Sequence, residues 1–261
     1  MRVFPVPAFE DNYIWVACGE AGQALAVDPG EAPPLEEALG REGLSLAGVA
    51  ITHHHWDHVG GLEALSRRHG IPSWGPAREQ GAWQRPVGEG DRVEVPGLAP
   101  WRVLEVPGHT AGHVAYLAPD PEHPEGGWLF CGDTLFAGGC GRLLGGTAAQ
   151  LHASLERLAA LPEGTRVCCA HEYTEANLRF ALEVEPGNEA LRRRLEEVRA
   201  LRRAGRPTLP STIGLERRTN PFLRCREPAV RAAAEARAGR PLATPLEVFT
   251  VLRVWKDSWR G

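Results

Sequence analysis

The stretch Thr52-His-His-His-Trp-Asp-His-Val-Gly-Gly61 decides the fold of this chain. It places four histidines and an aspartate within six residues, at the end of the apolar run Val49–Thr52 and before a glycine pair that opens a helix. Alternate residues of an extended chain face the same side, so His53 and His55 can reach one metal ion. The turn that follows lets Asp57 and His58 address a second ion beside the first. Histidine nitrogen and carboxylate oxygen suit zinc, iron or manganese, and the absence of cysteine ligands argues against a purely structural zinc site.

Three later segments complete the ligand set. Pro107-Gly-His-Thr-Ala-Gly-His113 supplies His109, Cys131-Gly-Asp-Thr134 supplies Asp133, and Cys168-Cys-Ala-His-Glu172 supplies His171. Each follows directly after a strand-like apolar run, which is where folds built on sheets place their sites. The two oxygens of Asp133 could bridge both ions. A lone histidine after a strand is weak evidence, but the segments together predict a centre for two divalent metal ions.

The chain changes character near Tyr173. Before it, short apolar runs closed by turn residues predict strands, with helical stretches between them. After it, strand signals disappear and the spacing is helical. The strands are expected at Leu25–Val27, Val49–Thr52, Trp101–Val106, Trp128–Cys131 and Arg166–Ala170, and the tail helices at Glu175–Glu185, Glu189–Ala204, Ala229–Ala238 and Leu246–Trp255. We therefore expect a mixed α/β domain over residues 1–172 and a helical domain over residues 173–261.

Composition and charge narrow the function. No apolar run approaches the ~20 residues that span a membrane, and Glu10 and Asp11 lie where a secretory signal needs an apolar core. The six cysteines form no C-x-x-C pair and are expected to be reduced, which favours a cytoplasmic protein. Residues 1–172 hold 11 basic and 22 acidic side chains, whereas residues 173–261 hold 18 basic and 11 acidic ones. The first part therefore suits cations, and the tail suits an anionic partner.

The order H-x-H-x-D-H followed by a single His, Asp and His resembles the metallo-β-lactamase superfamily. This resemblance implies an α+β fold, the αββα sandwich, carrying an appended C-terminal α-helical domain. It also implies that His53, His55 and His109 hold one metal, that Asp57, His58 and His171 hold the other, and that Asp133 bridges them. The superfamily serves hydrolases, nucleases and oxidoreductases, so the fold alone does not give the substrate.

Motifs along nearly the whole chain resemble the hydroxyacylglutathione hydrolase (glyoxalase II) family. They are Gly132-Asp-Thr-Leu-Phe136, Gly139-Cys-Gly-Arg142, Ala170-His-Glu-Tyr-Thr174, Glu185-Pro-Gly-Asn188 and Thr219-Asn-Pro-Phe222. By this resemblance Arg142, Tyr173, Arg253 and Lys256 contact the glutathione part of the substrate. Lys256 is also the only lysine beside 28 arginines. Leu144 stands where the family commonly has an aromatic residue, so that contact is reduced to an apolar one.

The resemblance implies hydrolysis of S-2-hydroxyacylglutathione thioesters by a dimetal-bound hydroxide, the second step of methylglyoxal detoxification. S-D-lactoylglutathione would give D-lactate and glutathione, with Asp57 and Asp133 orienting the hydroxide. The alternative is a mononuclear-iron glutathione persulfide dioxygenase on the same fold. A nucleic-acid partner is not expected, because the catalytic part is acidic and no basic run is interleaved with aromatics. We expect a monomer with zinc, or else iron or manganese, and neither a nucleic-acid nor a membrane partner.

Overall fold

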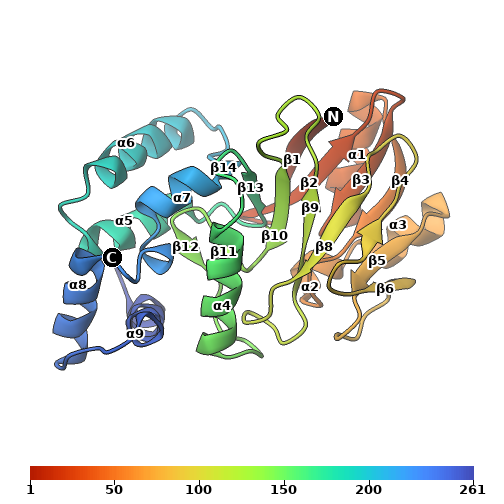
Figure 1. Ribbon diagram of the computed structural model, residues 1–261. Coiled ribbons are helices and arrows are strands. Elements are labelled where there is room, and N and C mark those ends of the chain that lie inside the picture. The colour runs from red at the N-terminus through yellow and green to blue at the C-terminus, as the bar shows by residue number, and fades with distance from the viewer.

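The computed structural model describes all residues, 1–261, and contains two six-stranded sheets that face each other (Figure 1). The strands of the first sheet, in the order in which they pair, are β1 (Arg2–Ala8), β2 (Asn12–Cys18), β3 (Gln23–Val27), β4 (Ser45–Ala50), β5 (Ser73–Pro76) and β6 (Arg85–Val87). Those of the second sheet, in pairing order, are β14 (Ser211–Thr212), β13 (Arg166–Cys169), β10 (Trp128–Gly132), β9 (Val114–Ala118), β8 (Trp101–Glu105) and β7 (Arg92–Val93). A small hairpin of β11 (Leu135–Phe136) and β12 (Gly139–Cys140) stands apart from both.

Helices cover the outer faces of the two sheets. The helices of the sandwich are α1 (Ala32–Glu42), α2 (Trp56–Val59), α3 (Leu62–His69) and α4 (Ala148–Ala159). One apolar core joins α1 and α3 to the first sheet, through residues such as Leu35 and Leu65 against Val49. A larger core fills the space between the sheets, where Trp15 meets Phe130 edge to face and Trp101 stacks on Phe130. The expected αββα sandwich with a helical tail is confirmed.

The tail after the last long strand is mostly helical. It contains α5 (Thr174–Val184), α6 (Glu189–Arg203), α7 (Ile213–Thr219), the 3-10 helix η1 (Pro221–Leu223), α8 (Pro228–Ala238) and α9 (Pro245–Ser258). The last helix begins with a capping box in which Thr244 and Glu247 satisfy each other's backbone N–H groups, and proline occupies its first turn. None of the helices is long and apolar enough to cross a membrane.

The tail is not built from helices alone, which corrects the expectation that strands end near residue 172. Its two-residue strand β14 pairs antiparallel with β13 and so extends the second sheet. Two residues give no readable alternation, so nothing in the sequence marked this strand. The core between the sheets also continues into the tail through Phe222, Phe249 and Leu252. The two parts therefore share one apolar interior.

Candidate dimetal site and substrate pocket

The candidate ligands lie on loops that meet at one edge of the sandwich. His53, His55, Asp57 and His58 follow β4, His109 lies between β8 and β9, Asp133 follows β10, and His171 follows β13. The two sheets touch at this edge, because the N–H of Tyr13 at the start of β2 donates to the carbonyl of Ala170. Segments more than a hundred residues apart are thus brought to one place.

Three histidines form the first cluster. The Nδ1 atom of His55 lies 3.0 Å from Nε2 of His53 and 3.1 Å from Nε2 of His109. Ligands bound ~2.0–2.1 Å from a tetrahedral ion lie about 3.3–3.4 Å from one another. The observed separations are close to such an edge, so the three nitrogens can face a common ion.

Asp57, His58 and His171 form the second cluster. The Oδ2 atom of Asp57 lies 3.4 Å from Nε2 of His58 and 3.5 Å from Nε2 of His171. Asp133 lies between the clusters and divides its oxygens: Oδ1 is 3.3 Å from His171 and 3.5 Å from His58, whereas Oδ2 is 3.5 Å from Nε2 of His109. This is the arrangement that a bridging carboxylate requires.

Two buried atoms, one in the second cluster and one on Asp133 beside it, test whether a metal fits there. Nε2 of His58 and Oδ1 of Asp133 are enclosed and have no hydrogen-bond partner. Burying polar atoms without partners costs about 1–3 kcal/mol each, so a native site needs something to satisfy them. In each of the two clusters the ligand atoms lie close enough together to bind one common ion. The donors therefore fit two divalent ions. The fold and these clusters establish a dimetal site.

Electrostatics around the two clusters differ. Burial, reinforced by neighbouring histidines, holds the pKa of His53 well below its usual value and also lowers the pKa of His55 and of His109. Burial opposes charge on His58 as well, but attraction by Asp133 and Asp28 outweighs it and raises its pKa. Burial likewise raises the pKa of Asp133, yet the nearby His58 and His171 bring the net value below the usual range. The carboxylates are therefore ionised, as metal binding requires.

Three residues that were not expected from the sequence orient the ligands of the second cluster. Asp28 accepts from Nδ1 of His58 at 3.0 Å and from the N–H of Thr52 at 2.7 Å. Asn12 donates to Oδ2 of Asp57 at 3.0 Å, and Asp11 lies 2.8 Å from Nδ1 of His171. Such partners fix the ring orientation of metal-binding histidines. Each is a single polar residue at the end of a strand or next to it, and no pattern in the sequence set it apart.

Glu79 joins the two loops that carry the first cluster. Its side chain is almost fully buried and accepts from both the backbone N–H and the ring of His54, at 2.8 and 2.7 Å. It also accepts from the hydroxyl of Thr110 and from the N–H of Gly112 at 3.1 Å. His54 thus points away from the cluster, as its alternation with the ligands suggests, and holds the loop through Glu79.

Close packing explains why glycine precedes two of the candidate ligands, His109 and Asp133. Gly132 has φ 47°, and a Cβ there would collide with the hydroxyl of Thr52 and the ring of His113. This close approach lets Nε2 of His113 accept from the N–H of Asp133 at 3.2 Å. Gly108, with φ 146°, faces the backbone of α4 at Leu151, where no Cβ fits. Glycine thereby places Asp133 and His109.

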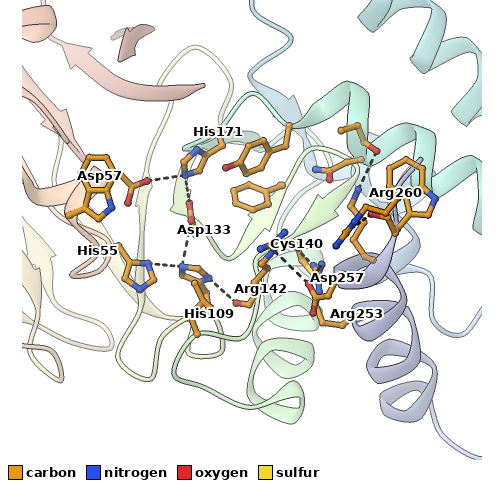
Figure 2. A pocket seen from close by; sticks show the side chains of 18 residues that line it. His55, Asp57, His109, Asp133, Cys140, Arg142, His171, Arg253, Asp257 and Arg260 are labelled. Carbon is orange, nitrogen blue, oxygen red and sulfur yellow. Dashed lines mark hydrogen bonds and ion pairs between the residues drawn. The ribbon is translucent and has the colours of Figure 1, made fainter. Parts of the chain in front are cut away.

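One pocket of about 620 Å³ connects the metal clusters to the tail (Figure 2). Its wall includes His55, Asp57, His109, Asp133 and His171 together with Arg142, Tyr173, Arg253 and Lys256. Figure 2 shows Asp57 and His55 on one side of Asp133, and Arg253, Asp257 and Arg260 on the other. All four residues that the family resemblance assigned to glutathione therefore line the pocket.

These four residues present different atoms to the pocket. Arg142 is largely exposed, with Nε 3.7 Å from Asp257. Tyr173 stacks on the ring of His171, with centroids 4.7 Å apart and planes 3° apart, and so joins the metal cluster to the tail. Lys256 places its ammonium 4.4 Å from the ring centre of Trp259 and 3.3 Å from the carbonyl of Ala176. Burial, together with the nearby Arg253, Arg142 and Arg179, lowers the pKa of Lys256 to about 8.

Arg253 lies deeper than a substrate-binding residue usually does. Only 4% of its surface is exposed. One Nη atom donates to the carbonyls of Cys140 at 2.8 Å and Gly141 at 3.2 Å, and the other to Asp257 at 3.0 Å. These bonds hold the loop that leads directly into Arg142.

The chain matches two known family descriptions, one for each part. Residues 9–171 match the metallo-β-lactamase superfamily, and residues 172–259 match the hydroxyacylglutathione hydrolase C-terminus. The protein named hydroxyacylglutathione hydrolase from Cupriavidus taiwanensis is 53% identical over 270 residues, which cover all of both chains.

Solved structures of other proteins share this fold at lower sequence identity. ETHE1 from Myxococcus xanthus is 26% identical with a TM-score of 0.67, covering 97% of this chain and 90% of that one. The protein TTHA1623, solved in a di-iron-bound form, is 29% identical with a TM-score of 0.59, covering 84% of this chain and 100% of that one. Similarity to the hydroxyacylglutathione hydrolase from Cupriavidus taiwanensis, in contrast, extends at high identity over the tail as well as the sandwich.

Proposed function

The chain belongs to the hydroxyacylglutathione hydrolase family of the metallo-β-lactamase superfamily, and on this premise we propose how it acts on its substrate. It hydrolyses S-2-hydroxyacylglutathione thioesters, S-D-lactoylglutathione giving D-lactate and glutathione. The observation that carries this function is the single pocket lined by both the metal clusters and the cations of the tail. Glutathione conjugates carry two carboxylates, so a positive region beside the reaction centre suits them.

We assign the ligands as the clusters group them. His53, His55 and His109 hold one ion, Asp57, His58 and His171 hold the other, and Asp133 bridges them. Zinc is the proposed metal, because its histidine and carboxylate ligands are the usual ones in catalytic sites, with iron and manganese as alternatives. When bound, such ions supply a hydroxide nucleophile at neutral pH and polarise the thioester carbonyl.

The side chains of Asp57 and Asp133 orient the attacking water and accept its proton. Both are ionised, because the neighbouring histidines keep their pKa values below the usual range although burial opposes this. Asn12 holds Oδ2 of Asp57 in place through its amide. A thiolate leaves readily, so no strong general acid is needed, and Asp257 is the only carboxyl group of the pocket lining besides these two.

The tail binds the peptide part of the substrate. Lys256 and Arg142 face the pocket with charged groups, and Tyr173 closes it beside His171. Arg253 contributes mainly by fixing the loop that carries Arg142, because its Nη donors are bonded to carbonyls and to Asp257. Leu144 is 58% exposed at the pocket wall and offers an apolar contact.

An assay of S-D-lactoylglutathione hydrolysis with metal analysis tests the function. We expect turnover with two metal ions per chain, and loss of both after Asp133→Ala. Turnover must continue without oxygen, which a persulfide dioxygenase would not allow. The overlap with the named hydrolase across the whole chain favours the hydrolase over this alternative. Absence of thioester cleavage by the metal-loaded protein would refute the function.

The cysteines indicate the compartment in which the protein acts. The six cysteines are all free and buried, as in proteins of a reducing compartment, where glutathione is also abundant. We propose a cytoplasmic monomer that binds a small-molecule thioester and neither nucleic acid nor membrane. Sedimentation analysis at micromolar concentration tests the monomer.

A further inference from the structure

An exposed aromatic side chain, Trp56, lines the metal end of the pocket, and a second one, Phe9, packs against it. Trp56 is 69% exposed, the most of any large apolar residue in the chain, and Phe9 is 42% exposed. Their rings meet edge to face, with centroids 5.0 Å apart and planes at 69°. Large aromatic side chains usually bury their surface, so an exposed pair of this kind indicates a surface that a ligand can cover.

The backbone of Phe9 is held in an uncommon conformation that keeps its ring in this place. Its φ is 49°, which bulky residues rarely adopt. Its N–H donates to Glu31 at 2.9 Å, and its ring lies over Gly30, where a Cβ would collide with it. Strain of this kind persists where the surroundings impose it and clusters at binding sites. Phe9 therefore serves as a support for Trp56.

Trp56 occupies the end of the pocket that lies opposite the tail. It stands between His55 and Asp57 in the chain, one from each metal cluster, and it lines the pocket. Figure 2 places Arg253 and Arg260 on the far side of Asp133 from these two residues. A thioester whose glutathione part reaches the tail must direct its acyl substituent toward the other end. Trp56 is the apolar surface available there.

We propose that Trp56, supported by Phe9, contacts the acyl substituent and favours 2-hydroxyacyl groups with aromatic or large apolar side chains. This rests on the proposed hydrolase function and adds the acyl preference of the same site. A lactoyl methyl group is too small to cover an indole ring. A phenyl substituent can bury against it, and contacts of this size discriminate substrates by about 10-fold or more.

The experiment compares kcat/KM for S-D-lactoylglutathione and S-D-mandeloylglutathione in the wild-type protein and in Trp56→Ala. We expect the mandeloyl thioester to lose about tenfold and the lactoyl thioester less than about threefold. Trp56→Phe should restore most of the mandeloyl activity. Phe9→Leu should give a smaller loss with the same preference, because it removes only the support. Metal content should stay at two ions per chain.

The control is Val254→Ala, which removes an apolar side chain that is 64% exposed on α9 and does not line the pocket. It should leave both substrates unchanged. An equal loss for both thioesters in Trp56→Ala, or no loss for either, would overturn the acyl contact while leaving the hydrolase intact. Failure of the wild-type protein to cleave either thioester would instead refute the underlying function.

Discussion

Lys256 gives a prediction in which the pH dependence of substrate binding follows from its surroundings. Its ammonium lies among three arginines: Arg253 on the same helix, Arg142 on the loop beside it and Arg179 on α5. Burial and these charges lower its pKa to about 8, and the nearby Cys140 opposes this only weakly as the last of the contributions. An arginine in its place would stay charged at any physiological pH.

The magnitude follows from the titration. With a pKa near 8, the charged fraction falls from about nine-tenths at pH 7 to about one-tenth at pH 9. A hydrogen bond from a charged donor contributes about 1.5–3 kcal/mol, which is more than a factor of ten in affinity. If the ammonium binds a glutathione carboxylate, KM should be nearly constant below pH 7 and rise about tenfold between pH 7 and pH 9. KM should rise and not fall as the pH increases, because only the protonated amine attracts an anion.

The assay measures KM and kcat for S-D-lactoylglutathione at half-unit steps over this range. The α-amino group of the substrate titrates nearby, so Lys256→Arg is the matched control that keeps a cation at this position. Its KM curve should lack the component due to Lys256, whereas Lys256→Ala should have a high KM at every pH with kcat largely retained. A wild-type KM that is constant between pH 7 and pH 9, or a curve for Lys256→Arg identical to the wild type, would refute the reasoning.

Three other substitutions test the surroundings of the site. Glu79→Gln replaces one of the two oxygens that together accept from four donors, so an amide NH2 group then faces two of these donors. The midpoint of thermal unfolding should therefore fall and metal should be lost more readily to a chelator, while Glu63→Gln at an exposed ion pair should change neither. Asp133→Asn removes the bridging charge, and metal analysis should find fewer than two ions per chain; two tightly held ions would contradict the bridge. Asn220→Ala leaves the carbonyls of Phe136 and Gly139 without their donor, so denaturant unfolding should show a loss of about 1–3 kcal/mol and KM should rise.

The residues that form the two clusters could be predicted from the sequence, because most of them lie close together in the chain. Four of the seven candidate ligands lie within six positions, from His53 to His58, and each of the other three follows a short apolar strand. Only five of the strands were predicted, those in which a short apolar run is closed by turn residues. The strands β1, β2, β5, β6, β7 and β9 were missed, and β2 is buried along its whole length, so it has no alternating pattern to read. The ends of the elements were harder to predict. The strand expected to end at Thr52 is β4, which ends at Ala50, because the backbone N–H and the hydroxyl of Thr52 bond to Asp28 instead.

The residues that orient the ligands could not be predicted, because their contacts are set by the three-dimensional arrangement. Asn12 and Asp57 are 45 positions apart, and Asp11 and His171 are 160 apart. Arg194 is a similar case: it is one of 28 arginines, yet it is buried and ion-paired with Glu216. The spacing of Leu191, Leu195 and Val198 places it on the buried face of α6, but its partner lies 22 positions away and is brought to it only by the fold.

The buried contacts of the tail change the account of what the tail does. Its charge suggested a surface that attracts an anion, but four of its residues bond instead to backbone groups of one segment, residues 136–141. These are Asn177 to Ala137, Glu216 to the N–H of Gly138, Asn220 to Phe136 and Gly139, and Arg253 to Cys140 and Gly141. This segment begins three residues after Asp133 and ends directly before Arg142. The segment connects Asp133, the proposed bridging ligand, to Arg142, a proposed substrate-binding cation. By holding this segment, the tail fixes the distance between the metal clusters and its own end of the pocket in addition to supplying charge.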